Sequence, residues 1–336
     1  MLGKMGRTLV TGAGGFIGSH LVEELVRRGR EVRAFVQYDA QNSWGWLDDI
    51  PDATREQVEV VSGDIRDPHG VRPVVDGCTV VYHLAALIGI PYSYQSPESY
   101  VETNVNGTLN VLQAARNAEV EKIVHTSTSE VYGTAQSVPM SEAHPLRGQS
   151  PYAASKIGAD QLAHSFYRSF ELPVAIARPF NTYGPRQSAR AVIPTIATQI
   201  AEGRRVLQLG ALHPTRDFTF VQDTVEAFIA VERAPDTVGE VVNMGSGHEI
   251  SIGDLAHLIA DVMGAEITIE REEERLRPEE SEVDRLRADV SKIRRLTEWA
   301  PPDDREAGLR RGLRATADWF AEPEHLSYYK VGQYAV

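Results

Sequence analysis

Cysteine, positive charge and long apolar runs are scarce in this chain, and each scarcity excludes a class of protein. A single cysteine, Cys78, excludes an internal disulfide and a cysteine-based metal cluster, so we expect a small core residue there and no metal site. The 34 basic and 47 acidic residues give a net charge of −13, which argues against nucleic acid or an anionic membrane as a partner. No apolar run approaches the roughly 20 residues that span a bilayer. Residues 1–6 show no signal peptide, so we expect a cytoplasmic protein.

A glycine-rich turn near the start of the chain is the most informative local motif. An apolar run over residues 8–11 predicts a buried strand, and a helical pattern begins at residue 21. Between them, Gly12, Gly15 and Gly18 follow a G-x-x-G-x-x-G spacing. Glycine allows a tight turn and lets a pyrophosphate approach backbone N–H groups at a helix N-terminus. In this strand–turn–helix context, the motif favours a dinucleotide site over a plain turn.

Apolar strand-like runs alternate with helical patterns along the chain. This alternation is typical of a parallel sheet with helices on both faces. The 336 residues exceed what one core usually holds, so we predict a Rossmann-type α/β domain with a smaller α/β domain attached. We interpret the charged stretch 270–287 as solvated surface. The predicted strands cover residues 31–36, 58–61, 80–84, 122–126 and 174–177, and the longest predicted helices cover residues 97–118 and 152–170.

Tyr152 and Lys156 form a second motif, one helical turn apart. A tyrosine with an ordinary pKa of about 10 is a poor base at neutral pH. A cation on the same helix face favours its phenolate, and the positive charge of an oxidised nicotinamide acts in the same direction. A helix-surface pair has the same spacing, but beside the glycine-rich turn we interpret these residues as a proton-transferring pair.

These motifs, with several others, resemble the extended short-chain dehydrogenase/reductases that act on nucleotide sugars. Within that family, segments 42–47, 126–136 and 186–195 resemble NAD-dependent 4,6-dehydratases of the legionaminic-acid type, which process nucleotide-linked N-acetylglucosamine. The other matching segments are 63–67, 83–86, 104–108, 127–133, 178–185 and 216–218.

The resemblance implies a bound NAD. It places Asp64 on the adenine amino group, Ile65 on the ring and Ala85 near a ribose, although an aspartate such as Asp64 also serves to cap loops. Tyr38 and Asp39 follow the second predicted strand, where no arginine or lysine is available for a 2′-phosphate, so we expect NAD rather than NADP. The implied cofactor residues are Gly12, Gly15, Phe16, Ile17, Gly18, Asp64, Ile65, Leu84, Ala85, Ala86, Asn104, Thr126, Tyr152, Lys156 and Pro179, with Asn104 supporting the active-site loops.

The resemblance also implies a catalytic set of Thr128, Tyr152 and Lys156, which oxidise C4 of the sugar. The resulting ketone acidifies the C5 hydrogen, and Glu130 is the carboxylate that we expect to take this proton, unless it is only a structural acid. Ser129 stands where deoxythymidine-diphosphate-glucose dehydratases have an aspartate that protonates the leaving hydroxyl. GDP-mannose dehydratases and UDP-glucuronate decarboxylases share the Thr-Ser-Glu arrangement found here.

For the substrate, the resemblance implies that Asn181 and Arg216 bind the diphosphate, because a guanidinium can donate two parallel hydrogen bonds. It adds Val192 to the substrate site and makes Arg277 a second nucleotide contact, although Arg277 lies in the charged stretch and could be surface. We predict an NAD domain over residues 1–177 plus about 217–246, and a nucleotide-sugar domain over the rest of 178–336.

The predicted function is a nucleotide-sugar 4,6-dehydratase with tightly bound NAD, acting on an NDP-N-acetylglucosamine-type hexose as a homodimer paired through the two long helices. Two alternatives stay open. One is a UDP-glucuronate decarboxylase or 4-epimerase of the same family, and the other is a non-catalytic regulator that senses NAD on the same fold.

Overall fold

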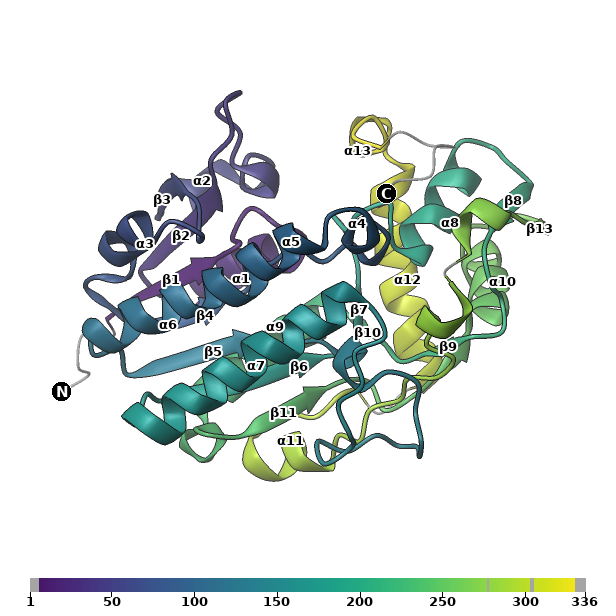
Figure 1. Ribbon diagram of the computed structural model, residues 1–336. Helices are drawn as coiled ribbons and strands as arrows, with labels where there is room; N and C mark the ends of the chain where they lie inside the picture. Colours follow the sequence, from purple (N-terminus) through teal and green to yellow (C-terminus); the bar gives the residue numbers. More distant parts are fainter. Residues whose placement is uncertain (1–5, 277, 303–304, 330–336) are drawn as a thin grey trace.

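A seven-stranded parallel sheet forms the centre of the molecule (Figure 1). The computed structural model describes residues 6–276, 278–302 and 305–329. In sheet order, the strands are β11 (Val241–Met244), β6 (Val174–Pro179), β5 (Lys122–Thr126), β4 (Cys78–His83), β1 (Arg7–Thr11), β2 (Val32–Gln37) and β3 (Val58–Gly63). The predicted Rossmann-type sheet is therefore confirmed, with strand ends that differ from the prediction by up to two residues.

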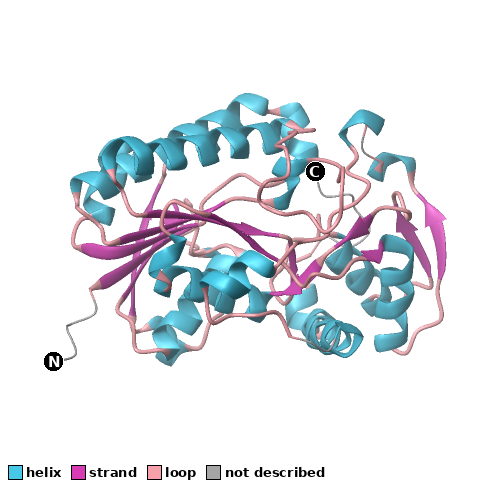
Figure 2. Cartoon of the chain, turned by 90° about the horizontal axis from the view of Figure 1, so that it is seen from below, coloured by secondary structure: helices cyan, strands magenta, loops and turns pink. Residues whose placement is uncertain are grey.

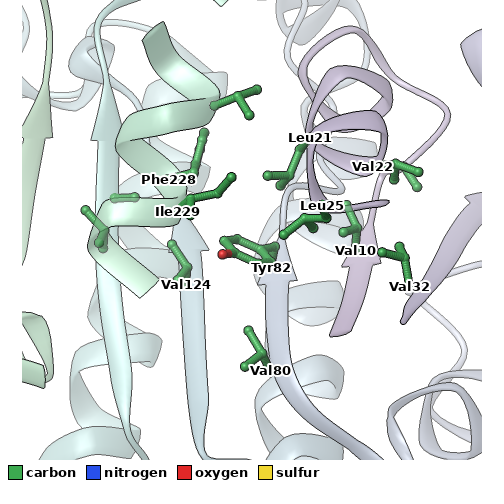
Figure 3. Packing of buried hydrophobic residues seen from close by; sticks show 14 of the residues in the cluster. Val10, Leu21, Val22, Leu25, Val32, Val80, Tyr82, Val124, Phe228 and Ile229 are labelled. Carbon is green, nitrogen blue, oxygen red and sulfur yellow. The ribbon is translucent and has the colours of Figure 1, made fainter. Parts of the chain in front are cut away.

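Helices cover both faces of this sheet (Figure 2). One face carries α1 (Phe16–Arg27), α9 (Val221–Arg233) and α11 (Ser291–Leu296), and the other carries α3 (Pro68–Val75), α6 (Gly107–Asn117) and α7 (Pro151–Phe170). Figure 3 shows Leu21 and Leu25 of α1 and Phe228 of α9 packing over Val10 and Tyr82 of the sheet, all five fully buried. Burying each such side chain contributes about 1.5–3 kcal/mol.

On the α3 face, Cys78 is buried and unpaired, as expected of a small core residue. No group of three or more His, Cys, Asp or Glu side chains that could hold a metal ion occurs among the described residues. None of the helices that the structure describes is long and apolar enough to cross a membrane.

The first long predicted helix is interrupted by a change of helical type. It runs as α5 (Pro97–Tyr100), the π-helical segment η2 (Val101–Asn106) and then α6. Such π turns within helices are frequent at functional sites. The second long helix, α7, begins at Pro151, where the Ser150 hydroxyl accepts a hydrogen bond from the Ala153 N–H at 3.1 Å.

A smaller part of the molecule adjoins the carboxyl ends of the sheet strands. It has its own apolar core between α8, α10 and α12. Its strands pair as β7 (Asn181–Tyr183) with β10 (Phe218–Phe220), β9 (Thr215–Arg216) with β12 (Ile250–Ser251), and β8 (Val206–Leu209) with β13 (Thr268–Arg271). Its helices are α8 (Val192–Ala201), α10 (Ile252–Val262) and α12 (Arg305–Ala321). The remaining short elements are α2 (Asp52–Arg55), α4 (Ile90–Gln95), α13 (Pro323–Leu326), η1 (Gly45–Leu47), η3 (Ser129–Tyr132), η4 (Pro235–Thr237), η5 (Glu273–Arg275) and η6 (Glu279–Ser281).

Candidate active site

The glycine-rich turn joins β1 to α1, and steric contact explains two of its glycines. Gly12 has a φ of +68°, and a Cβ there would lie 2.8 Å from the backbone of Ala85. A Cβ on Gly18 would lie 2.2 Å from the Gly12 carbonyl oxygen. Gly15 is exposed and caps α1 without a side-chain hydrogen bond, so the N–H groups of the first helical turn are open to an anion. This turn therefore fits the pyrophosphate of a dinucleotide, with Phe16 and Ile17 half-buried behind it.

A buried histidine connects this turn to the rest of the site. The Thr108 hydroxyl donates to the Asn104 carbonyl at 2.6 Å, so His83 Nε2 must be the donor in its 3.0 Å contact with Thr108 Oγ1. His83 Nδ1 is then an acceptor for the Thr11 hydroxyl at 2.8 Å. Burial lowers the pKa of His83 well below its usual value, which agrees with this neutral form. Thr11 Oγ1 in turn accepts from the Ala85 N–H at 3.1 Å.

Asn104, at the end of η2, links the loop after β4 to α7. Its side-chain oxygen accepts from the Leu87 N–H at 2.8 Å, and its amide nitrogen donates to the Leu87 carbonyl and to Ser155 Oγ, both at 2.9 Å. Leu84, Ala85 and Ala86 lie in the same loop, which follows β4 directly. These contacts are those needed to support an active-site loop, the role that we expected of Asn104.

Tyr152 and Lys156 are both buried on α7. Lys156 Nζ donates to the Thr126 carbonyl at 2.7 Å, and burial lowers the pKa of Lys156 to about 8, although the Asp160 carboxylate acts against this shift. Burial raises the pKa of Tyr152 well above its usual value, while a hydrogen bond with the Thr128 hydroxyl lowers it and the charge of Glu130 raises it again. Thr128 and Tyr152 are thus in hydrogen-bond contact, and Lys156 lies one helical turn after Tyr152 on α7.

A fully buried ion pair fixes α7 against the ends of β5 and β6. Asp160 accepts from Arg178 Nη2 at 2.8 Å, from Ser127 Oγ at 2.5 Å and from His125 Nε2 at 3.2 Å. Burial would raise the pKa of Asp160, but the His125 hydrogen bond and the Arg178 charge hold it well below its usual range. Ser127 lies between Thr126, which binds Lys156, and Thr128. Arg178 lies in a sequence segment that resembles the family but was assigned no role, and Asp160 was not singled out from the sequence. The spacing of Asp160, four residues after Lys156 on the same helix face, was the sequence signal that could have identified it.

Glu130 and Ser129 begin the short helix η3, which Thr128 caps through the Glu130 N–H at 3.3 Å. Ser129 is buried, whereas the Glu130 side chain is half-buried. Its carboxylate has no hydrogen bond or ion pair within the described part of the chain, although its charge reaches Tyr152. The role of Glu130 as a base for the C5 proton stays a prediction.

The residues expected at the adenosine end lie at the carboxyl ends of β2 and β3. Asp64 forms a two-pronged ion pair with Arg66, which lowers the pKa of its carboxyl. Ile65 is buried against α6, where a Cβ on Gly107 would lie 2.6 Å from its Cδ1. Asp39 is exposed and accepts from the Gln41 N–H at 2.6 Å. The adenine role of Asp64 therefore stays a prediction and requires a carboxylate oxygen shared with Arg66.

The residues expected to bind substrate occupy half-buried and buried positions where the structure describes them. Asn181, two residues after Pro179, has a buried amide oxygen without a hydrogen-bond partner in the described residues, so a ligand donor can satisfy it. Arg216 is buried and donates to Glu282 at 3.1 Å and to the Thr215 carbonyl at 3.0 Å. Val192, at the first position of α8, is half-buried. Arg277 lies outside the described residues.

The expectation that stretch 270–287 is mainly solvated surface needs correction. Val283 and Leu286 are buried against Val131 and Tyr132 of η3, and Glu282 pairs with Arg216. Most of its described charged residues are exposed, as expected, but Glu282 is not and its apolar residues pack inward, a pattern that charge content alone does not reveal. The segment therefore forms a wall behind the catalytic turn.

Comparison with known proteins identifies the family. Residues 9–311 match the family described as GDP-mannose 4,6 dehydratase. The chain belongs to this family. Its members include enzymes of several related activities, so membership shows an NAD-dependent nucleotide-sugar dehydratase/epimerase-type enzyme without fixing the reaction.

Three curated relatives illustrate that range. The chain is 36% identical to dTDP-glucose 4,6-dehydratase of Streptomyces griseus, over 96% of this chain and 95% of the relative. It is 34% identical to UDP-glucose 4-epimerase of Mycolicibacterium smegmatis, over 94% and 98%. It is 32% identical to UDP-N-acetyl-alpha-D-glucosaminuronate decarboxylase of Bacillus cytotoxicus, over 95% and 99%.

Solved structures agree with the fold and with the cofactor expectation. The dTDP-glucose 4,6-dehydratase DesIV of Streptomyces venezuelae, solved with NAD and TYD, superposes with a TM-score of 0.82 at 30% identity over 96% of this chain and 99% of that one. UDP-glucuronic acid 4-epimerase of Bacillus cereus, solved with UDP-glucuronic acid and NAD, gives 0.82 at 28% identity over 96% and 100%. The expectation of NAD is thus confirmed at the level of the family.

Proposed function

We propose that this enzyme is an NAD-dependent nucleotide-sugar 4,6-dehydratase acting on an NDP-N-acetylglucosamine-type hexose. The observation that carries the proposal is the Glu130 carboxylate, which has no partner among the described residues and lies one short turn beyond Thr128. An enzyme that only oxidises C4 and then returns the hydride needs no such free carboxylate. A dehydratase needs a base for C5.

The side chains divide this chemistry between them. Bound NAD supplies the hydride acceptor at C4 and later the donor at C6. Tyr152 takes the proton from the C4 hydroxyl, Lys156 stabilises the phenolate, and Thr128 hydrogen-bonds the same hydroxyl. Glu130 takes the C5 proton and passes it to the departing C6 hydroxyl, which leaves as water, since Ser129 provides no acid. When the hydride returns to C6, Glu130 delivers a proton from solvent to C5, and Tyr152 releases its proton to solvent. The two protonation states of Glu130 thus alternate within one turnover.

The test is to change Glu130→Gln and follow both half-reactions. Absorbance at the NADH band reports C4 oxidation, and mass spectrometry of the sugar nucleotide reports loss of water. We expect transient reduction of NAD, loss of dehydration by a factor of about 10²–10⁴, and no deuterium from solvent at C5. Glu121→Gln is the control, because Glu121 is exposed at the opposite end of β5. Full product formation by Glu130→Gln would refute the role.

A decarboxylase or 4-epimerase is the second candidate, favoured by relatives with those names at similar identity. A panel of UDP-, GDP- and dTDP-linked hexoses and hexuronic acids separates the three reactions by product mass. Dehydration removes water, decarboxylation removes carbon dioxide, and epimerisation leaves the mass unchanged.

We also assign residues 1–177 with about 217–246 to the NAD-binding domain and the rest of 178–336 to the sugar-binding domain. The packing of α9 and β11 with the central sheet supports this division. A homodimer through η2, α6 and α7 completes the proposal.

A further inference from the structure

Four aromatic rings from distant parts of the chain meet in one cluster, which we call the aromatic clasp: Trp46, Trp319, Tyr328 and Tyr329. Trp46 belongs to η1, Trp319 to α12, and the two tyrosines follow α13. The Trp46 ring lies 5.5 Å from Trp319, 5.4 Å from Tyr328 and 6.4 Å from Tyr329, measured between centroids. The first two contacts are edge-to-face and the third is stacked, all within the range of favourable aromatic pairs.

The two tyrosine hydroxyls of the clasp bind loops on different parts of the molecule. Tyr328 Oη donates to Asp49 Oδ1 at 3.1 Å, in the segment after β2. Tyr329 Oη donates to the Gln187 carbonyl at 2.9 Å, in the loop between β7 and α8. The Gln187 side chain donates to the Thr182 carbonyl at 2.8 Å, one residue after Asn181. The C-terminal segment, yellow in Figure 1, therefore ties a cofactor-side loop to a substrate-side loop.

The backbone of residues 44–46 is in direct contact with the glycine-rich turn. The Trp46 N–H donates to the Gly14 carbonyl at 2.9 Å. A Cβ on Gly14 would lie 2.3 Å from the Trp44 carbonyl oxygen, and a Cβ on Gly45 would lie 2.5 Å from the Gly14 carbonyl oxygen. The two backbones are thus in contact with no space for a side chain. Gly14 immediately precedes Gly15, the N-cap of α1, so the segment 44–46 moves only if it releases the turn.

We propose that the aromatic clasp positions Trp46 and thereby keeps the glycine-rich turn closed, so that the dinucleotide stays bound from one substrate to the next. The inference rests on the proposed reaction, in which the hydride taken from C4 must return to the same sugar. If the cofactor dissociated before the hydride returned, the keto sugar would be left without a hydride donor. The clasp residues are positioning residues, since they act through the backbone of residues 44–46.

The segment around Trp46 is anchored on one flank, because Leu47 is fully buried in the core of the sheet and Trp44 packs against that core. Trp46 is only half-buried, and Tyr328 has 52% of its surface exposed. Asp48 binds the Trp44 N–H and Ser43 within the segment, but these are local contacts that do not tie it to the rest of the molecule. At Trp46 itself, the clasp and the Gly14 contact supply the ties to the rest of the molecule.

The test measures cofactor release by Trp46→Ala in the full-length protein. Enzyme loaded with NADH is mixed with excess NAD, and the decay of bound-NADH fluorescence gives the dissociation rate constant. We expect release about tenfold faster than in the unaltered protein and less dinucleotide retained after gel filtration. Trp46→Phe, which keeps an aromatic ring, should restore most of the slow release. Tyr329→Phe removes only the Gln187 hydrogen bond and should accelerate release by about two- to fivefold.

Phe170→Ala is the matched control, because Phe170 is a 45% exposed ring at the far end of α7 that packs on Arg116. It should leave the release rate unchanged. Equal release rates in Trp46→Ala, Tyr329→Phe and the unaltered protein would overturn the clasp, even with dehydration intact. If the unaltered protein does not bind NADH at all, the proposed function is refuted instead. Should Trp46→Ala fail to fold, the Tyr329→Phe rate alone decides.

Discussion

At the scale of single residues, burial shifts Tyr152 and Lys156 in opposite directions. Burial raises the pKa of Tyr152 and lowers the pKa of Lys156 to about 8, so in the ligand-free enzyme burial disfavours the charged form of each group. Near pH 7 Lys156 is still protonated and can stabilise a phenolate. The positive charge of oxidised NAD supplies the further attraction that the tyrosine needs. We therefore expect Tyr152 and Lys156 to transfer a proton only when NAD is bound.

Lys156→Met tests this dependence. Removing the ammonium raises the pKa of Tyr152, so the phenolate fraction at pH 7 falls tenfold per pKa unit. We expect NAD reduction by substrate to slow by about 10²–10⁴ at pH 7, with activity recovering towards higher pH. Lys122→Met is the control, because burial also lowers the pKa of Lys122 to about 8, yet its Nζ binds Thr237 and Ala234 away from the site. An unshifted pH profile in Lys156→Met would contradict the role.

The sequence predicted most residue types of the site but not their partners. The tyrosine, lysine, threonine and glutamate follow from motifs because their spacing along one helix and one turn is local. The pairing of Arg216 with Glu282, 66 positions apart, depends on how segment 281–288 folds against η3. The charge content of that segment predicted an exposed surface. The burial of Val283 and Leu286 is decided by tertiary packing, which composition does not reveal.

At the scale of elements, α7 carries the chemistry on one face. Tyr152, Lys156 and Asp160 follow each other at intervals of four residues, so they point in one direction. The first two are the proposed proton-transferring pair, and the third contacts Arg178 and Ser127 at the strand ends. The helix is thus fixed to β5 and β6 one turn behind the lysine, which sets the distance from Lys156 to Thr128.

Asp160→Asn should show this coupling in two ways. It leaves the Arg178 guanidinium, 2% exposed, without its ion-pair partner, which costs about 3–5 kcal/mol of unfolding free energy. It also removes a negative charge that raises the pKa of Lys156, so the loss of activity at high pH should begin at lower pH. Urea unfolding and a pH–rate profile measure the two effects.

Glu306→Gln is the control for that ion pair. It breaks an exposed helical pair with Arg310, which is worth at most about 1 kcal/mol. An Asp160→Asn enzyme with unaltered stability and an unaltered pH profile would show that the buried pair has no positioning role.

The extent of each element was predictable where its signal is local. The helix predicted over residues 152–170 agrees with α7 to one residue, and Ser150 with Pro151 is a local start signal, whereas the left-handed Glu171 at φ +56° that ends α7 has no such signal in the sequence. The π-helical segment η2 was not predictable, because a helix with shifted hydrogen bonds has the same apolar periodicity over six residues. Its position depends on packing, since Gly107 meets Ile65 and Asn104 meets Ser155 only in the folded chain.

At the scale of the whole molecule, contacts near the glycine-rich turn join the two parts, in addition to the packing of segment 281–288 on η3. Arg186 pairs with Glu23 of α1 at 2.5 Å, and His20 contacts the Pro185 carbonyl at 3.1 Å. Burial lowers the pKa of His20 to about 4, so this contact stays uncharged at neutral pH. Together with the clasp, these contacts connect the loop after β7 to the cofactor side. If a sugar nucleotide binds beside Asn181, as we propose, it would act on the same loop that the C-terminal segment holds.

The outer face of η2, α6 and α7 is where we expect two copies to meet. Val101 and Leu109 are 47% and 38% exposed there, on the helices that the family resemblance assigns to a dimer. Sedimentation should give twice the 37.1 kDa of one chain at micromolar concentration. Leu109→Glu should shift the protein towards monomer, because an interface that buries an unpaired carboxylate loses several kcal/mol (~3–5), whereas Gln57→Glu, beside β3, should leave the dimer intact. A monomeric unaltered protein, or a Leu109→Glu dimer of full strength, would show that these helices face solvent.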